Sequence, residues 1–352
     1  MLPSSDLTCS TATGHHALGP PAAGSGAAAA RSRRILATTL SYLVTVVVLL
    51  VLSFLLPRIL PGDPLTALQD KDHIPDAATL AREKKYYGLD KPLAAQFGHY
   101  LSELGRGDLG TSIQDSRPVL TEIGERLPWT LLLVLTALAI ASVAGAVGGI
   151  HSAWRRGELS DSVLTTLFLG LDNVPTFIVG YLLLLIFAVI LGWLPLAGSQ
   201  TAFATMSTIG HVGDVLSHLM LPAITLALSI VGGHYLLMRN TMASELGQGY
   251  LLLGRAKGLS PRRLKYRYAA RNALLPVVTH AGVQLGFLVS SSLLIETVFA
   301  YPGLGQLTQH AVAYRDYPLI TGTAIVFTIL VLLANLAVDL LYRMLDPRTR
   351  ER

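Results

Sequence analysis

The chain has 352 residues, of which 51% are hydrophobic and only 14% are charged. Soluble domains carry roughly 25% charged residues, so this composition excludes an ordinary soluble domain and indicates a membrane protein. The formal net charge is +5, and the basic residues gather in short segments between long apolar runs.

The first 34 residues form a segment rich in Ala, Gly, Ser and Pro, which also holds the single cysteine, Cys9. It has too few large apolar side chains to offset the entropy lost on ordering, so we expect residues 1–34 to be a disordered tail. A cleaved signal peptide is the alternative. However, the apolar run that follows ends in Leu56-Pro57-Arg58 rather than at a small-x-small cleavage site, which favours a retained helix.

Six apolar segments are long enough to cross a bilayer, which takes about 20 residues as a helix because lipid offers no partner to exposed backbone groups. The third contains Asp172 and Pro175, and the fourth is interrupted by Pro222, Gly232 and Gly233. We predict an all-α polytopic membrane protein with helices at 35–56, 129–153, 163–191, 218–238, 274–297 and 319–341.

Basic residues indicate the orientation, because Lys and Arg are retained on the cytoplasmic side of short loops. With both termini inside, 17 basic residues lie on that side, against only Arg315 in the two short outer loops. Residues 57–128 are then a small extracytoplasmic region, since long segments translocate largely regardless of charge. Its turn signals and the amphipathic run 94–104 predict a lid, and residues 343–352 form a cytoplasmic tail.

The cytoplasmic segment 239–272 is expected to form a helix, a tight turn and a second helix. Arg255 and Lys257 suit the last turn of a helix that starts near Ala243, and Gly258 can take the positive φ that follows it. Ser260 is then an N-cap residue, with Pro261 in the first position of the second helix.

Such a hairpin has a short apolar tip at Gly258-Leu259 with cations on both sides. A rigid element of this kind suits insertion into a cleft of another protein. The alternative is a basic loop that only retains its side of the membrane and attracts anionic lipid, at about 1 kcal/mol per residue.

The segment "GRAKGLSPRRLKYRYAARNALLPVVT" resembles the cytoplasmic loop of permease subunits of ATP-binding-cassette importers of the dipeptide/oligopeptide/nickel type. "LPGDP", "YGLDKPL", "GDLGTS", "RLPWTLLL", "ETVFAYPGLGQL" and "RDYPLITG" resemble further signature segments of that family, in the same order. The resemblance covers about 290 residues. It implies a type I importer permease fold in which the loop couples to an ATPase. The matching residues are Gly254, Arg255, Ala256, Lys257, Gly258, Leu259, Ser260, Pro261 and Arg262.

One departure lies just before this glycine motif, where the family usually has small or threonine-alanine residues. This chain has Leu252, Leu253 and Gly254 there. The resemblance also implies the assembly around the chain: a second, non-identical permease, two cytoplasmic ATP-binding subunits, an extracytoplasmic solute-binding protein and membrane lipid, without nucleic acid.

The chain itself is not expected to be an enzyme or to bind a cofactor. It contains no Gly-Lys dipeptide, which a phosphate-binding loop needs, so ATP and Mg²⁺ belong to the partner subunits. Peptide is the expected cargo, with nickel or another small solute as the alternative. Two distant alternatives are a secondary transporter that works alone and a membrane scaffold whose loop binds lipid.

Ionisable residues inside the spans are costly to insert and are therefore functional candidates. Asp172, with Asn173 and Pro175, is expected near the middle of the third span and toward the bundle interior, either on the translocation pathway or in a structural hydrogen bond. Glu296 is expected at the outer end of the fifth span, either positioning the following loop or forming an outer gate. The ten histidines are scattered, and we predict no metal site.

Overall fold

The computed structural model describes residue 40 and residues 44–55, 57–59, 82, 85, 90–202 and 207–345. The chain divides into the units Met1–Val48 and Leu49–Arg352, and apart from helical residues 40 and 44–48 all described residues belong to the second unit. The predicted tail at 1–34 and the residues after 345 lie outside the described part.

The described residues form helices and no strand, apart from one isolated antiparallel bridge between Thr111 and Pro118. The prediction of an all-α chain is therefore confirmed. The elements with π-helical hydrogen bonding are η1 and η2. In chain order the elements are α4 (Leu93–Leu104), α5 (Val119–Trp154), α6 (Leu159–Asp172), α7 (Thr176–Leu183), η1 (Leu184–Ile190), α8 (Thr208–Leu228), α9 (Val231–Leu246), α10 (Gly249–Ala256), α11 (Pro261–Arg263), η2 (Leu264–Ala269), α12 (Ala270–Val298), α13 (Leu304–Tyr314) and α14 (Tyr317–Leu345).

Several of these helices can cross a membrane. By length and composition, four do so alone, and α6 with α7 and η1 forms a fifth candidate that is bent. A shorter apolar helix, Val44–Ile59, covers most of the described part of the first predicted span. The chain is thus a multi-pass membrane protein, with four or five candidate spans among the described residues against the six predicted. The four are Val119–Trp154, Thr208–Leu228, Pro261–Val298 and Tyr317–Val338.

The third predicted span, 163–191, is not a straight helix. α6 ends at Asp172, α7 begins after Pro175, and the two are bent by 102°. Proline lacks an N–H and disfavours the helical conformation in the residue before it, which favours a break of the helix at Pro175. Asp172 therefore ends a helix, whereas the sequence placed it in the middle of one.

The fourth predicted span, 218–238, is shared between α8 and α9. Pro222 lies inside α8 without breaking it, and the break comes later, before Val231. Gly232 in the first turn of α9 packs against the end of α6, where an added Cβ would lie 2.9 Å from both Asp172 Cγ and Phe168 O. The glycine thus permits close contact between α6 and α9.

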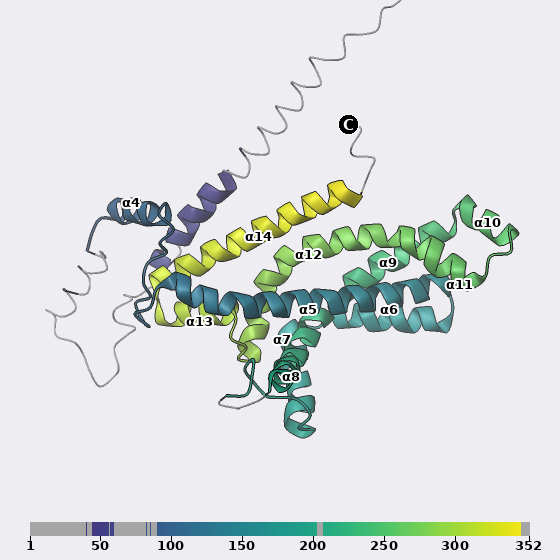
Figure 1. The fold of residues 1–352 in the computed structure, drawn as a ribbon, viewed down its shortest axis with the longest axis horizontal. Coiled ribbons are helices and arrows are strands. Elements are labelled where there is room, and N and C mark those ends of the chain that lie inside the picture. Colours follow the sequence, from purple (N-terminus) through teal and green to yellow (C-terminus); the bar gives the residue numbers. More distant parts are fainter. Residues whose placement is uncertain are drawn as a thin grey trace, which may run out of the picture. The chain divides into compact units, whose positions relative to one another are not determined.

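α5 runs through the bundle beside α9 (Figure 1). Gly145 and Gly149 lie one turn apart on α5, and an added Cβ would come within 2.7 Å of His234 Cβ and of Met238 Cβ, respectively. Small residues four positions apart let two helix backbones approach closely inside a membrane. The largest cluster of buried side chains lies where α5, α8, α9 and α12 meet.

Two ends of the bundle carry the features that matter below. α10 and α11 lie at one end, called here the hairpin end, and α4 and α13 lie at the opposite end, called the α13 end (Figure 1). α4 coincides with the amphipathic run predicted at 94–104. α5 begins at Val119 and continues through Pro128, so residues 119–128, predicted as part of the outer region, extend the second span.

Candidate functional site

The hairpin, residues 249–263, has the local geometry that the sequence predicts. Gly258 has a φ of +77°, and its N–H donates to Arg255 O at 2.9 Å. Ser260 accepts a hydrogen bond from the Arg263 N–H at 3.4 Å, and Pro261 occupies the first helical position. The preceding helix differs from the prediction, because α9 ends at Leu246 and a separate helix, α10, begins at Gly249 after two intervening residues.

The tip of the hairpin is held against the bundle. Leu259, predicted as part of an exposed apolar tip, is partly buried and packs against the cluster that contains Leu251 and Leu264. A Cβ on Gly254 would lie 2.8 Å from Leu264 Cδ2 and 3.4 Å from Leu259 Cδ1. Glycine at 254 thus lets the two arms of the hairpin pack closely.

The exposed apolar surface of the hairpin comes from residues that the sequence analysis treated as a departure from the family. Leu252 and Leu253 are 62% and 56% exposed, and Tyr266 in η2 is 56% exposed. The hairpin and η2 also carry five exposed cations. These are Arg255, Lys257, Arg262, Arg263 and Arg267.

A hydrogen-bonded clamp fixes the base of the hairpin. The Tyr250 hydroxyl contacts Glu245 Oε2 at the end of α9 and accepts a hydrogen bond from Asn272 Nδ2 of α12 at 3.0 Å. Burial and the neighbouring Glu245 carboxylate raise the pKa of Tyr250, so its hydroxyl stays protonated and can donate. The first turn of α10 is thereby tied to both flanking helices.

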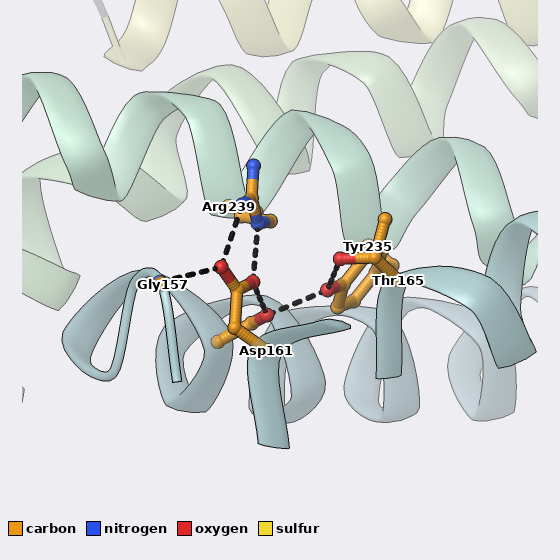
Figure 2. Close-up of polar contacts among 6 residues, drawn as sticks. Gly157, Asp161, Thr165, Tyr235 and Arg239 are labelled. Atoms are coloured by element: carbon orange, nitrogen blue, oxygen red, sulfur yellow. Dashed lines mark hydrogen bonds and ion pairs between the residues drawn. The ribbon is translucent and has the colours of Figure 1, made fainter. Parts of the chain in front are cut away.

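Arg239, the first residue of the segment 239–272 and one of the 17 basic residues expected on the cytoplasmic side, faces inward. Its Nε and Nη2 donate to Asp161 Oδ1 and Oδ2 at 2.7 and 2.8 Å (Figure 2). Asp161 is buried in the first turn of α6 and also accepts hydrogen bonds from the Ser152 hydroxyl and, at 3.0 Å, from the Gly157 N–H. A bidentate buried pair of this kind joins α6 to α9, and its partners are too far apart in the chain for sequence patterns to indicate it.

The Asp161 cluster continues through Tyr235. The Tyr235 hydroxyl lies 2.6 Å from that of Ser152 on α5 and 2.7 Å from that of Thr165 on α6 (Figure 2). Three helices therefore meet in one buried polar network on the hairpin side of the bundle.

The candidate pathway residues at the α6–α7 bend do not lie as predicted. Asp172, Asn173 and Pro175 are exposed on this chain rather than directed into its interior. Asn173 Nδ2 donates to Leu169 O at 2.6 Å, one turn back in α6. Asp172 lies over Gly232 of α9. The polar groups of the bend therefore remain exposed on this single chain while packing against α6 and α9.

Glu296 lies in the last turn of α12, beside the N-terminus of α13 and at the opposite end of α12 from the hairpin, and is fully buried. Its Oε1 accepts hydrogen bonds from Thr130 Oγ1 at 2.8 Å and Ser292 Oγ at 3.1 Å. Its Oε2 accepts from the N–H groups of Gly305 at 2.6 Å and Gln306 at 3.2 Å. The carboxylate thus holds the N-terminus of α13 onto α5 and α12, where it also complements the helix dipole. This geometry supports the loop-positioning alternative.

The glycines of "ETVFAYPGLGQL" make room for this carboxylate. A Cβ on Gly303 would collide with the Glu296 carboxylate, and one on Gly305 would collide with the Leu293 backbone. A second buried acid, Asp316, accepts hydrogen bonds from Ser112 Oγ at 2.6 Å and from the Leu319 N–H at 3.1 Å. It joins the "GDLGTS" and "RDYPLITG" segments at the start of α14.

Two of the scattered histidines meet in the structure. The rings of His234 on α9 and His280 on α12 lie 5.1 Å apart between centroids. Among the described residues, no group of three or more His, Cys, Asp or Glu side chains is arranged to hold a metal ion.

Comparisons with known proteins agree with this architecture. The family described as "Binding-protein-dependent transport system inner membrane component" matches residues 145–351, and its N-terminal companion family matches residues 32–134. The solved chain from "Inward facing conformations of the MetNI methionine ABC transporter" is 19% identical with a TM-score of 0.52, covering 64% of this chain and 97% of that one. This likeness gives the fold, that of a type I importer permease.

Curated relatives match over most of their length. "Glutathione transport system permease protein GsiC" of Salmonella choleraesuis is 36% identical, over 90% of this chain and 98% of that protein. GsiC of Pectobacterium atrosepticum is 37% identical over 87% and 95%. "Di/tripeptide transport system permease protein DppB" of Pseudomonas aeruginosa is 35% identical over 86% and 94%. The chain belongs to the family of inner membrane components of binding-protein-dependent transport systems, the permease subunits of ATP-binding-cassette importers.

Proposed function

We propose that the chain forms half of a translocation pathway that imports small peptides across the bacterial plasma membrane. The supporting observation is that relatives at 35–37% identity, matched over nearly their whole length, are named glutathione and di/tripeptide permeases. Nickel import by the same machinery is less favoured, since none of these names refers to a metal.

The hairpin is the proposed contact with an ATP-binding subunit, through the nine residues from Gly254 to Arg262. Its supporting features are the stiff turn at Gly258, the clamp at Tyr250 and the exposed Leu252 and Leu253 among cations. An apolar patch rimmed by charge is typical of a protein–protein contact, whereas a loop that only binds lipid needs no fixed turn.

Movement of the ATPase subunits is proposed to reach the bundle through the network shown in Figure 2, because Arg239 and Tyr235 lie on the helix that leads into the hairpin. Transport requires two docked states, each favoured by a different nucleotide state. ATP and Mg²⁺ are bound by those subunits, and this chain carries no cofactor and no catalytic residue.

The assembly that we propose has two permeases, two ATPase subunits and an extracytoplasmic solute-binding protein, surrounded by lipid. α7 and η1, after the bend, offer the face for a second, non-identical permease, because Phe177, Tyr181 and Leu185 are 43%, 57% and 47% exposed on the single chain. Asp172, Asn173 and Pro175, exposed at the bend, are then candidates for the pathway between the two permeases.

The orientation proposed from the charge distribution places both termini and the hairpin in the cytoplasm. The α13 end then faces the solute-binding protein. A reporter fused within the 249–263 hairpin should be active only on the cytoplasmic side, and activity on the outer side would contradict the whole assignment.

The central experiment combines association and uptake in cells that lack their own peptide importers. The chain is co-expressed with its cognate partner subunits, and labelled dialanine, glutathione and a nickel chelate are offered. We expect uptake of the peptides only. Nickel uptake without peptide uptake would contradict the cargo, and transport by the chain alone would contradict the coupling.

A matched pair of variants tests the docking surface. Leu253→Asp should lower co-purification of the ATPase subunit by about tenfold, as for a residue at the centre of an interface. Leu159→Asp changes another exposed leucine, 81% exposed at the start of α6 and outside the hairpin, and should leave association unchanged. Equal effects of the two variants would show that the hairpin has no special role.

A further inference from the structure

A cavity of about 180 Å³ lies at the α13 end, separate from the hairpin, the α6–α7 bend and Glu296. It lies between the end of helix Val44–Ile59, α4 and the first turns of α14. Phe54, Ile113 and Ile325 supply apolar walls, and Arg58, Lys91 and His99 are among its polar lining residues.

Arg58 is held in a fixed, partly buried position in this cavity. The centre of its guanidinium lies 3.6 Å from the centroid of the Phe54 ring. Nη1 donates to Phe54 O at 2.7 Å, and Nε donates to Gln96 Oε1 at 3.1 Å. Both contacts are made to neutral groups, so the planar guanidinium is oriented without being neutralised.

Among the described residues, the charges around Arg58 do not balance it. Across the ion pairs of the described residues, none joins Arg58 to an Asp or Glu. Glu103 is the one acid among the described residues that line the cavity, and its Oε1 lies 3.0 Å from His99 Nε2, while Lys85 and Lys91 add further positive charge. Removing a cation from water without a counter-charge is costly, so an arrangement of this kind is stabilised by an anion that binds to it.

We propose that this cavity binds a single oxyanion, a phosphate or a carboxylate, with Arg58 as its principal donor. Arginine binds such groups well because its planar fork matches their oxygen atoms. Arg58 ends an apolar helix, and Tyr317 begins the candidate span Tyr317–Val338. The cavity is thus at the depth where charged and aromatic side chains meet lipid headgroups. A phospholipid phosphate and a soluble anion are the two sources of this chemistry, and the inference does not depend on the proposed peptide cargo.

The test uses the full-length chain purified in detergent. Native mass spectrometry measures the affinity for phosphatidylglycerol, with diacylglycerol as a lipid that lacks the phosphate, and a thermal-shift assay titrates inorganic phosphate and acetate. Arg58→Gln should lower the affinity for the bound anion by at least about tenfold, because a hydrogen bond to a charged group contributes about that much to binding. Arg117→Gln, an exposed arginine at the same end that pairs with Glu125 outside the cavity, should have no effect.

Saturable binding of phosphatidylglycerol but not diacylglycerol, lost in Arg58→Gln, supports the proposal with lipid as the source. Stabilisation by phosphate or acetate that Arg58→Gln abolishes supports it with a soluble source. Absence of saturable binding, or binding that Arg58→Gln leaves unchanged, overturns it. If Arg58→Gln does not fold, the same affinity is measured for Lys91→Gln, which changes an exposed residue of the cavity lining. An affinity equal to that of the parent chain then overturns the proposal.

Discussion

The two ends of the bundle differ in what their functional side chains contact. At the α13 end, the buried carboxylates of Glu296 and Asp316 are each bound by several donors from separate segments. At the hairpin end, apolar side chains such as Leu252 and Tyr266 remain exposed, and the turn is defined by local backbone geometry at Gly258. The Glu296 and Asp316 sites are completed within the chain, whereas the exposed apolar side chains of the hairpin are the ones that we propose a partner covers.

This difference indicates where substitutions should affect folding and where they should affect coupling. A buried carboxylate with satisfied partners fixes the relative positions of helices, and its loss leaves several donors unpaired. An exposed apolar patch contributes little to the stability of the chain alone, so its loss should be measurable mainly in association. The buried Asp161–Arg239 pair lies between the two cases, because it joins helices and also borders the hairpin.

The largest effect is expected for Glu296→Leu. The N–H groups of Gly305 and Gln306 and the hydroxyl of Thr130 lose their acceptor in a buried site, which should lower the free energy of unfolding by about 3–5 kcal/mol. Thermal unfolding of the purified chain measures this. Glu125→Leu, an exposed glutamate at the same end, should stay within about 0.5 kcal/mol of the parent. Equal melting temperatures for the two variants would contradict the role assigned to Glu296.

The next effect is expected for Asp161→Asn. The amide keeps the size of the side chain but removes the charge, so Arg239 stays partly buried without its counter-ion and stability should fall by about 2–3 kcal/mol. The double variant Asp161→Ala with Arg239→Ala should lose less than the sum of the two single alanine variants, because neither charge is then left alone. Strictly additive losses would mean that the pair does not act as a unit.

Gly258→Pro should act on association more than on stability. Proline fixes φ near −65°, whereas Gly258 has +77°, and the substitution removes the N–H that donates to Arg255. The turn must then rearrange, so we expect co-purification of the ATPase subunit and peptide uptake to be abolished.

The same substitution at Gly249 provides the control on the same hairpin. Gly249 is the first residue of α10, it follows an extended Gln248, and nothing lies within 4 Å of an added Cβ, so proline fits there. Normal uptake by Gly258→Pro, or loss of uptake by Gly249→Pro, would contradict a specific role of the Gly258 turn in coupling.

The sequence could predict features that depend on residues close together in the chain, and it could not predict contacts between residues far apart in it. Gly258, Ser260 and Pro261 were predictable because turn and cap preferences depend on neighbouring residues only. The Asp161–Arg239 pair spans 78 positions and the Glu296–Thr130 bond spans 166, and no local pattern reports such contacts.

Two breaks within the predicted spans also could not be detected from mean hydropathy. It averages over about 20 residues, so it merged α6 with α7 across the proline bend and α8 with α9 across the break before Val231. The inward position of Leu259 was missed for a related reason, because exposure depends on the body of the bundle on which the hairpin packs.

The smallest effect, and the one that separates stability from coupling most cleanly, is expected for Ser260→Ala. Losing an N-cap side chain costs about 0.5–2 kcal/mol, and the long 3.4 Å hydrogen bond to the Arg263 N–H places this cap at the low end. Ser207 caps α8 with an equally long hydrogen bond, 3.3 Å from the Gly210 N–H, so Ser207→Ala should lower the melting temperature by a similar amount. Only Ser260→Ala changes the entry of the chain into α11, and only it should reduce nucleotide-dependent uptake. If the two variants reduced uptake equally, the hairpin would be an ordinary helix junction, and the contrast between the two ends of the bundle would concern packing alone.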